Sequence, residues 1–319
     1  MREISPMQLT QLARTLTAGL LLAGLLFPAS LVHAQDKFIR QEDVIYGRKF
    51  GTALTLDVFT PKENANGAAL VWVVSGGWYS DHNAINNGAF IQEFLNRGYT
   101  VFAVVHGSQP HFTIPEILGD MHRAVRFIRS RAEQFKIDPQ RIGILGASAG
   151  GHLSLMQGTA GDLGNAAAKD PVDKQSSRVQ AVACFFPPTD FLNYGTTGEN
   201  ALGVGILKDF RAPFDFKEYD TKTRSFVPVT DPAKIQAIGK QISPITHVTA
   251  DDPPTLIVHG DADKLVPIQQ AELIIAKLKE AKVPAELVVK PGAAHGWAGI
   301  DKDLVKLADW FDMYLQKKE

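Results

Sequence analysis

Residues Gly146-Ala147-Ser148-Ala149-Gly150 form a Gly-x-Ser-x-Gly pentapeptide, and this stretch decides the expected fold. The apolar run 141–145 before it predicts a strand, and the apolar segment 151–156 behind it predicts a helix. Strand, pentapeptide and helix in this order predict a nucleophile elbow, whose tight turn requires small residues two positions before and after the serine. Such a turn exposes the Ser148 hydroxyl at the sheet edge, where a helix N-terminus favours negative charge.

A serine hydroxyl is a weak nucleophile at neutral pH. The elbow therefore predicts a histidine that takes its proton and an acid that orients the histidine. Both are expected after the serine, each in a loop behind a later strand. Two strand-like runs fit: 254–259 leads into Asp261 and Asp263, and 285–290 leads into His295. Spacing leaves either aspartate open as the acid, with the other as a turn residue.

Only His295 among the nine histidines combines the right order with a glycine-rich loop. His152 stands on the helix behind the serine, and its backbone direction points it away from the hydroxyl. His259 ends a strand, where local packing or hydrogen bonding is expected. We therefore predict His295 as the base.

Several stretches resemble the α/β-hydrolase esterase and lipase superfamily, close to its hormone-sensitive-lipase-like and feruloyl/acetylxylan-esterase-like branches: 146–153, 243–246, 252–267 and 294–296. The resemblance covers nearly the whole chain from about Asp43 onward. It implies a mostly parallel central sheet flanked by helices, and a serine esterase that requires no metal or cofactor. It also implies that Asp263, which stands before x-x-Val-Pro, is the acid of the triad.

The loop after the strand-like run 71–74 reads Ser75-Gly76-Gly77-Trp78-Tyr79. The family pattern here is His-Gly-Gly-Gly followed by an aromatic residue. Aligned on Trp78, this chain has Val74 in place of the histidine and Ser75 in place of the first glycine. Gly76 and Gly77 remain at the positions that the resemblance assigns to the amides of the oxyanion hole.

The backbone N–H of Ala149, directly after the nucleophile, is expected to complete the oxyanion hole. Glycines in the other loop let its backbone approach a substrate without a Cβ in the way. The aromatic residues Trp78 and Tyr79 have two interpretations, because they either line the mouth of a substrate pocket or pack beneath the loop.

Residues 1–34 have the pattern of a secretory signal peptide. Arg2 and Arg14 precede an apolar run over 16–32, and Val32-His33-Ala34 offers a cleavage site. An uncleaved membrane anchor is the alternative, but the run contains Pro28 and is short for a span. We expect export to a periplasm or the exterior, with no membrane span in the mature protein.

The remaining residues, 35–319, suit one large α/β domain. A net charge of −1 without a basic stripe argues against nucleic acid as a partner. Cys184 is the only cysteine, so no disulfide forms within the chain, and its apolar surroundings predict a buried small residue. The segment of about 193–241 interrupts the alternation of strands and helices, and it predicts a cap-like insertion before the acid strand. A surface insertion without substrate contact is the alternative.

The sequence thus predicts a serine carboxylesterase that hydrolyses short-chain acyl esters, such as acetyl or feruloyl groups on plant polysaccharide. A peptidase of the prolyl-oligopeptidase kind is a second reading, although 319 residues leave no room for the large propeller those enzymes carry. A third interpretation is a non-catalytic binding module on the same fold, and the presence of all three expected triad residues disfavours it. The stretch Gly146-x-Ser148-x-x-Gly151 also imitates the glycine motif of a dinucleotide site. We set this interpretation aside, because the stretch does not lie in an early βαβ unit and no suitably placed acid could bind a ribose.

Overall fold

The computed structural model describes residues 37–86 and 89–316, so the expected signal peptide over 1–34 lies outside the described residues. The strands are β1 Phe38–Lys49, β2 Thr52–Pro61, β3 Ala69–Val73, β4 Thr100–Val105, β5 Ile142–Ala147, β6 Ala181–Phe185, β7 Lys217–Asp220, β8 Ser225–Pro228, β9 Thr255–Gly260 and β10 Ala285–Lys290. The α-helices are α1 Ala89–Asn96, α2 Ile114–Ser130, α3 Ala132–Phe135, α4 Ala149–Ala160, α5 Pro232–Gln241, α6 Gln269–Glu280 and α7 Leu304–Leu315. Short 3₁₀ helices are η1 His82–Asn86, η2 Gly205–Phe210, η3 Ala212–Phe214, η4 Pro244–His247 and η5 Ile300–Asp303.

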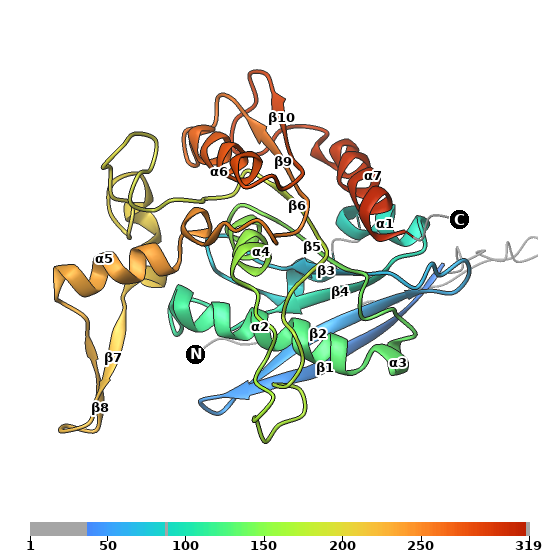
Figure 1. The fold of residues 1–319 in the computed structure, drawn as a ribbon, viewed down its shortest axis with the longest axis horizontal. Helices are drawn as coiled ribbons and strands as arrows, with labels where there is room; N and C mark the ends of the chain where they lie inside the picture. Colours follow the sequence, from blue (N-terminus) through green and yellow to red (C-terminus); the bar gives the residue numbers. More distant parts are fainter. Residues whose placement is uncertain (1–36, 87–88, 317–319) are drawn as a thin grey trace, which may run out of the picture. The chain divides into compact units, whose positions relative to one another are not determined.

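Eight strands form one twisted sheet in the order β1-β2-β4-β3-β5-β6-β9-β10 (Figure 1). β1, β2 and β4 pair antiparallel, and every other pairing in this sheet is parallel. The central strands β3, β5, β6 and β9 are almost wholly buried, which explains their continuous apolar runs. The observed architecture is the mostly parallel α/β-hydrolase sheet that the sequence predicts.

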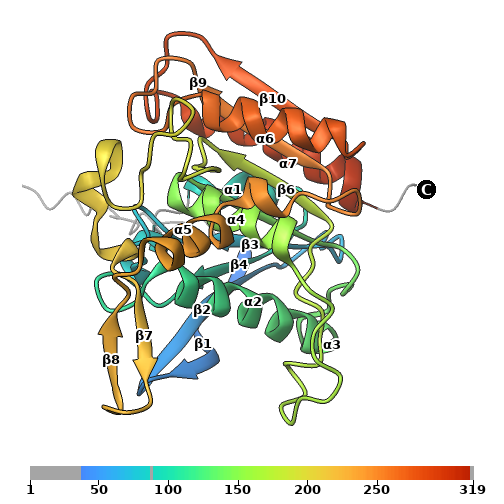
Figure 2. The same cartoon turned by 60° about the vertical axis from the view of Figure 1, so that its left-hand side comes forward.

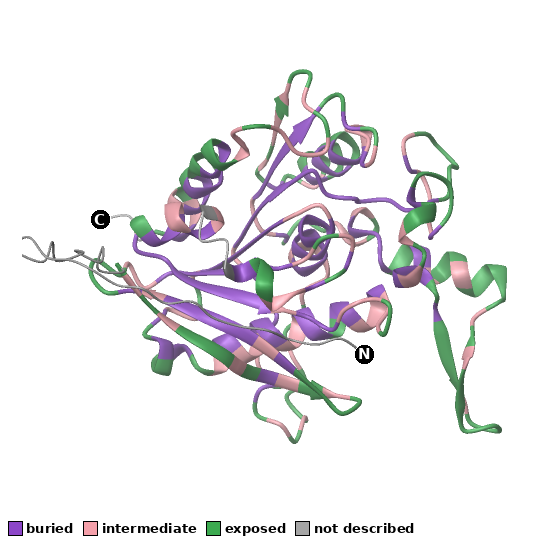
Figure 3. Cartoon of the chain, turned by 180° about the vertical axis from the view of Figure 1, so that it is seen from behind, coloured by how far each residue is buried: buried purple, intermediate pink, exposed green. Residues whose placement is uncertain are grey.

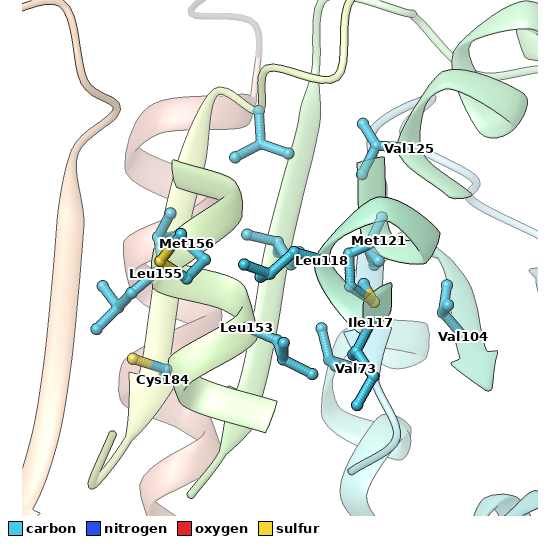
Figure 4. Packing of buried hydrophobic residues seen from close by; sticks show 14 of the residues in the cluster. Val73, Val104, Ile117, Leu118, Met121, Val125, Leu153, Leu155, Met156 and Cys184 are labelled. Atoms are coloured by element: carbon cyan, nitrogen blue, oxygen red, sulfur yellow. The ribbon is translucent and has the colours of Figure 1, made fainter. Parts of the chain in front are cut away.

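Helices cover both faces of this sheet (Figure 2). Apolar side chains of α2, α4 and α6 belong to one buried cluster, and those of α1 and α7 belong to a second. Figure 4 shows Ile117 and Met121 of α2 and Leu153 of α4 packing over the strands. Cys184 of β6 is fully buried in the first cluster, and burial raises the pKa of its thiol well above the usual range.

Helix α2 begins at Ile114, directly after the N-cap residue Thr113. The Glu116 carboxylate accepts the backbone N–H of Thr113 at 2.8 Å, and Pro115 occupies the first turn. This capping box adds a turn whose start is set by polar contacts instead of apolar periodicity. Across the described ranges, none of the helices has the length and apolar character needed to cross a bilayer.

The segment between β6 and β9 departs from the βα alternation. It contains η2, η3, the two-stranded β7-β8 hairpin, α5 and η4. The hairpin and α5 are largely exposed (Figure 3). This placement fits the expected insertion over about 193–241, whose role as a cap stays a prediction.

We expect Gly146→Ala to destabilise the fold strongly, because an added Cβ would lie 2.4 Å from the Gly150 carbonyl group, within backbone that cannot move aside. Overpacking typically costs about 1–3 kcal/mol, and a clash with backbone lies at the upper end of this range. Gly119→Ala is the matched control, since Gly119 is an exposed residue of α2 with open space around its Cα. That change should instead stabilise the protein by about 0.5–1 kcal/mol. Urea unfolding measures both, and similar midpoints for the two variants would contradict the prediction.

Candidate active site

Ser148 lies in the sharp turn between β5 and α4. Its φ and ψ are 55° and −121°, a conformation that residues with a Cβ rarely adopt. Its N–H donates to the Phe185 carbonyl at 3.0 Å, and its carbonyl accepts the His152 N–H at 2.9 Å. A Cβ on Gly146 would lie 2.4 Å from the Gly150 carbonyl group, and one on Gly150 would lie 2.8 Å from the Val73 carbonyl oxygen, so neither position has room for a side chain. The pentapeptide therefore forms the strained elbow that its sequence predicts.

His295 connects Ser148 to Asp263. Its Nε2 lies 2.9 Å from Ser148 Oγ, and its Nδ1 lies 2.7 Å from Asp263 Oδ2. The carboxylate can only accept, so Nδ1 donates to it, and Nε2 is the ring nitrogen that faces the serine hydroxyl. The three side chains come from the loops after β5, β9 and β10, which are parallel strands with their carboxyl ends at one edge of the sheet.

Asp263 is held by further hydrogen bonds. Its Oδ1 accepts the N–H groups of Leu265 and Val266, each at 2.9 Å. His259 Nε2, which donates to the Val266 carbonyl, lies 3.5 Å from Asp263 Oδ2. Burial opposes ionisation of this carboxyl, but hydrogen bonds from His259, His295 and Val266 outweigh it and hold the pKa of Asp263 well below its usual range.

Asp261, the alternative acid, makes a different contact. It is exposed, and its Oδ1 accepts the Gly292 N–H at 2.6 Å, which links the loops that follow β9 and β10. The geometry therefore separates two aspartates that spacing could not. His152 also lies apart from the serine hydroxyl, since its Nδ1 accepts from Trp78 Nε1 at 3.1 Å and its Nε2 donates to the Ile242 carbonyl at 2.7 Å.

Phe186 is a site residue that the sequence analysis missed. Its ring centroid lies 4.5 Å from that of His295, and its φ is 34°. Its N–H donates to the Val258 carbonyl at 3.0 Å, which fixes the residue directly after β6. An aromatic residue after a buried strand looks like ordinary core in the sequence, so only the tertiary structure identifies this contact.

The loop after β3 differs from its expected arrangement at Gly76. The Gly76 N–H donates to the Tyr79 carbonyl and the Tyr79 N–H donates back, both at 2.9 Å. This small turn engages the Gly76 donor, so its expected place in the oxyanion hole is corrected. Gly77 and Ala149, at the start of α4, remain the candidates. Gly77 has φ 56°, and a Cβ there would lie 2.6 Å from the ring of Phe210 in η2.

Of the two aromatic residues that follow, Trp78 packs beneath the loop. It is 2% exposed, and its ring contacts His152, Phe191 and Phe214. Of the two interpretations of Trp78, its burial therefore favours packing beneath the loop over lining a substrate pocket. Tyr79 is 52% exposed at the turn.

A cleft of about 1690 Å³ lies beside this loop. Its walls come from the β1-β2 turn, the start of β2, the loop that follows β4 and the insertion. None of the triad residues lines it, but His106, in its wall, lies within hydrogen-bond distance of Ser75. His106 therefore links the wall of the cleft to the loop after β3.

One group of side chains in the described part of the chain has the make-up of a metal site. Ligand-type atoms of Asp43, Asp57 and His82 lie within 4.8 Å of one another. Arg40 Nε donates to Asp57 Oδ2 at 2.8 Å, so the buried carboxylate already has a cationic partner. We therefore interpret this group as an ion-paired cluster.

The sheet order and the elbow define an α/β-hydrolase, and comparisons with known proteins agree. The BD-FAE family model matches residues 56–278, well over half of the 319 residues. The chain therefore belongs to the BD-FAE family.

The named relatives share about a quarter of their aligned residues with this chain. The chain is 26% identical to Esterase LipC of Mycobacterium tuberculosis over 268 residues, which are 83% of this chain and 62% of LipC. It is 26% identical to the acetylxylan esterase of Xylanibacter ruminicola over 87% of this chain and 50% of that protein. The matched region thus spans between one half and about three fifths of the length of these curated relatives. A solved truncated carbohydrate esterase from gut microbiota matches with TM-score 0.69 and 25% identity, over 88% of this chain and 99% of that one.

Asp263 should make the stability of this protein acid-sensitive. Its folded pKa is depressed, so its contribution is present above the unfolded pKa of about 3.9 and is lost as the pH falls toward the folded value. We expect Asp263→Asn, which has no carboxyl group to titrate at this position, to lose less free energy of unfolding than the wild type between about pH 6 and about pH 3. Urea unfolding across this range measures the difference, and parallel losses in both proteins would contradict it.

Proposed function

We propose that this protein is a serine carboxylesterase in which Ser148 is the nucleophile, His295 the general base and Asp263 the orienting acid. The observation that supports this most directly is the unbroken line of hydrogen bonds from Asp263 through His295 to Ser148, with separations of 2.7 and 2.9 Å. Hydroxyl, imidazole and carboxylate in this order generate a nucleophile at neutral pH. The chemistry proposed here involves no metal or cofactor.

In the first half of the reaction, Ser148 Oγ attacks the acyl carbon and its proton passes to His295 Nε2. Asp263 stabilises the imidazolium that results. The tetrahedral intermediate then collapses as the C–O bond to the alcohol breaks, and His295 returns the proton to the departing oxygen. Ser148 is left esterified by the acyl group.

In the second half, water attacks the acyl group of Ser148 and gives its proton to His295. Collapse of the second intermediate releases the carboxylic acid and returns the proton to Ser148 Oγ. We assign the N–H groups of Gly77 and Ala149 to the developing oxyanion in both steps. Each lost donor of this kind costs about 100- to 1000-fold in rate.

We further propose that the ester is a short acyl group, such as acetyl or feruloyl, on a polysaccharide. Two of the relatives are named as an acetylxylan esterase and a carbohydrate esterase. Export is part of this proposal, because residues 1–34 have the pattern of a signal peptide and polysaccharide is an external substrate.

The cleft beside the loop after β3 suits the sugar part of such an ester. Phe50, Phe112 and Phe226 line it, and the ring centroid of Phe50 lies 6.1–6.3 Å from those of the other two. Phe50 is 71% exposed with φ 46°, in a two-residue turn where Asn or Gly is usual. A bulky residue there costs about 1–2 kcal/mol in backbone strain. An exposed aromatic residue at such a position favours a role in binding.

Labelling with a fluorophosphonate tests the nucleophile. We expect the wild type to be labelled and to hydrolyse p-nitrophenyl acetate, and Ser148→Ala to lose both activities, with a fall of about 10⁴-fold or more in kcat. Asp263→Asn should lower kcat by roughly 10³- to 10⁴-fold because the imidazole loses its correct tautomer. Asp261→Asn is the matched control and should keep wild-type activity.

The substrates separate the remaining alternatives. Faster cleavage of a proline-containing amide than of simple esters would favour the peptidase. Absence of both labelling and hydrolysis in the folded wild type would favour a binding module and overturn the esterase assignment.

Phe226→Ala tests the cleft. We expect kcat/KM for acetylated xylo-oligosaccharides to fall about tenfold, as loss of one aromatic contact predicts, with p-nitrophenyl acetate unaffected because that small ester does not reach the cleft. Leu163→Ala, which removes an exposed apolar side chain outside the cleft, is the control. An equal effect on both substrates would contradict a sugar-binding role.

A further inference from the structure

We propose that Ser75 and His106 are positioning residues that fix the loop carrying the Gly77 donor relative to the Ser148 elbow. This inference rests on the proposed esterase function and concerns how its oxyanion hole is built. The two residues follow neighbouring parallel strands, since Ser75 comes just after β3 and His106 just after β4. His106 Nε2 lies 2.9 Å from Ser75 Oγ, and His106 is 3% exposed.

The direction of this hydrogen bond follows from the other ring nitrogen. His106 Nδ1 lies 2.7 Å from the Gly107 carbonyl, which can only accept, so Nδ1 carries the proton. Burial lowers the pKa of His106 to about 4, although its hydrogen bond to Gly107 opposes the shift. The ring is therefore neutral at pH 7, and Ser75 Oγ donates to the Nε2 lone pair. The single hydroxyl proton of Ser75 is therefore engaged in the hydrogen bond to His106.

His106 is itself held by a buried ion pair. The Gly107 N–H donates to Asp120 Oδ2 at 2.9 Å, and the same oxygen accepts from Lys49 Nζ at 2.6 Å. Asp120 is 4% exposed on α2, and Lys49 ends β1. This series of contacts therefore links β1 and α2, through Gly107 and His106, to the loop that begins at Ser75.

A second set of bonds joins the far end of the same loop to the segment after β4. The Ser80 N–H donates to Ser108 Oγ at 2.9 Å, and the Gln109 N–H donates to the Trp78 carbonyl at 3.2 Å. The loop is thus held at both ends, with Gly77 between them. A Cβ on Gly150 of the elbow would lie 3.3 Å from the Ser75 carbonyl oxygen, so the loop also packs on the turn that presents Ser148.

This arrangement accounts for the departure of the chain from the His-Gly-Gly-Gly pattern. Val74 and Ser75 replace its first two residues, so the loop itself contributes no imidazole. His106, which follows β4, places an imidazole against this loop, and the Ser75 hydroxyl supplies a contact with it that a glycine could not make. Because the oxyanion donors must match the transition state closely, a displacement of about 1 Å at Gly77 would slow the reaction by about 100-fold.

Ser75→Ala tests the proposal. We expect kcat for p-nitrophenyl acetate to fall about 10- to 100-fold with KM changed less than about twofold, because the lost alignment acts on the transition state. Affinity for a trifluoromethyl ketone, which forms a tetrahedral adduct with the serine, should fall by a similar factor. Ser75→Thr retains the hydroxyl and should recover most of the lost kcat.

The matched control is Ser177→Ala. Ser177 is fully buried, whereas Ser75 is partly buried, and Ser177 Oγ likewise lies 3.0 Å from a histidine nitrogen, His122 Nδ1. Because Ser177 is the more buried of the two, Ser177→Ala should lower the melting temperature at least as much as Ser75→Ala while leaving kcat unchanged. If the two variants have the same kcat, or Ser75→Ala acts only on KM, the positioning role is wrong and the esterase function stands. If the folded wild type hydrolyses no ester, both proposals are wrong.

Discussion

The backbone of Ser148 is the constraint on which the site depends. Its φ of 55° and ψ of −121° put the residue in a strained region, at a cost of order 1–3 kcal/mol. The close approach of Gly146 to Gly150 and the bond from Ser148 N to the Phe185 carbonyl keep it there. The strain is thus maintained by a buried strand and helix, and it holds one hydroxyl above the sheet edge.

The parallel sheet then brings distant segments to that hydroxyl. Asp263 and His295 follow β9 and β10, which pair in register, and His295 meets a serine 147 positions earlier in the chain. Phe186, after β6, packs on the imidazole between them. Every one of these residues stands just beyond a strand's carboxyl end, so the geometry of the site is a consequence of strand order.

The loop after β3 shows how this chain differs from the pattern its family suggests. Gly76 is engaged in a turn with Tyr79, and Trp78 is buried under the insertion. Phe210 of the insertion lies against Gly77. The insertion therefore contacts the candidate oxyanion loop directly, and its contact with substrate stays a prediction.

The sequence by itself predicted the strands of the sheet and the chain order of Ser148, Asp263 and His295, because buried parallel strands are continuous apolar runs and the elbow glycines are sterically required. It also indicated Asp263 through a motif, although two aspartates on one loop could not be separated by spacing. Only the tertiary structure decided which amides are engaged, that Trp78 faces inward and that His106 bonds to Ser75. Those outcomes depend on contacts between separate loops, which no local pattern of residues encodes.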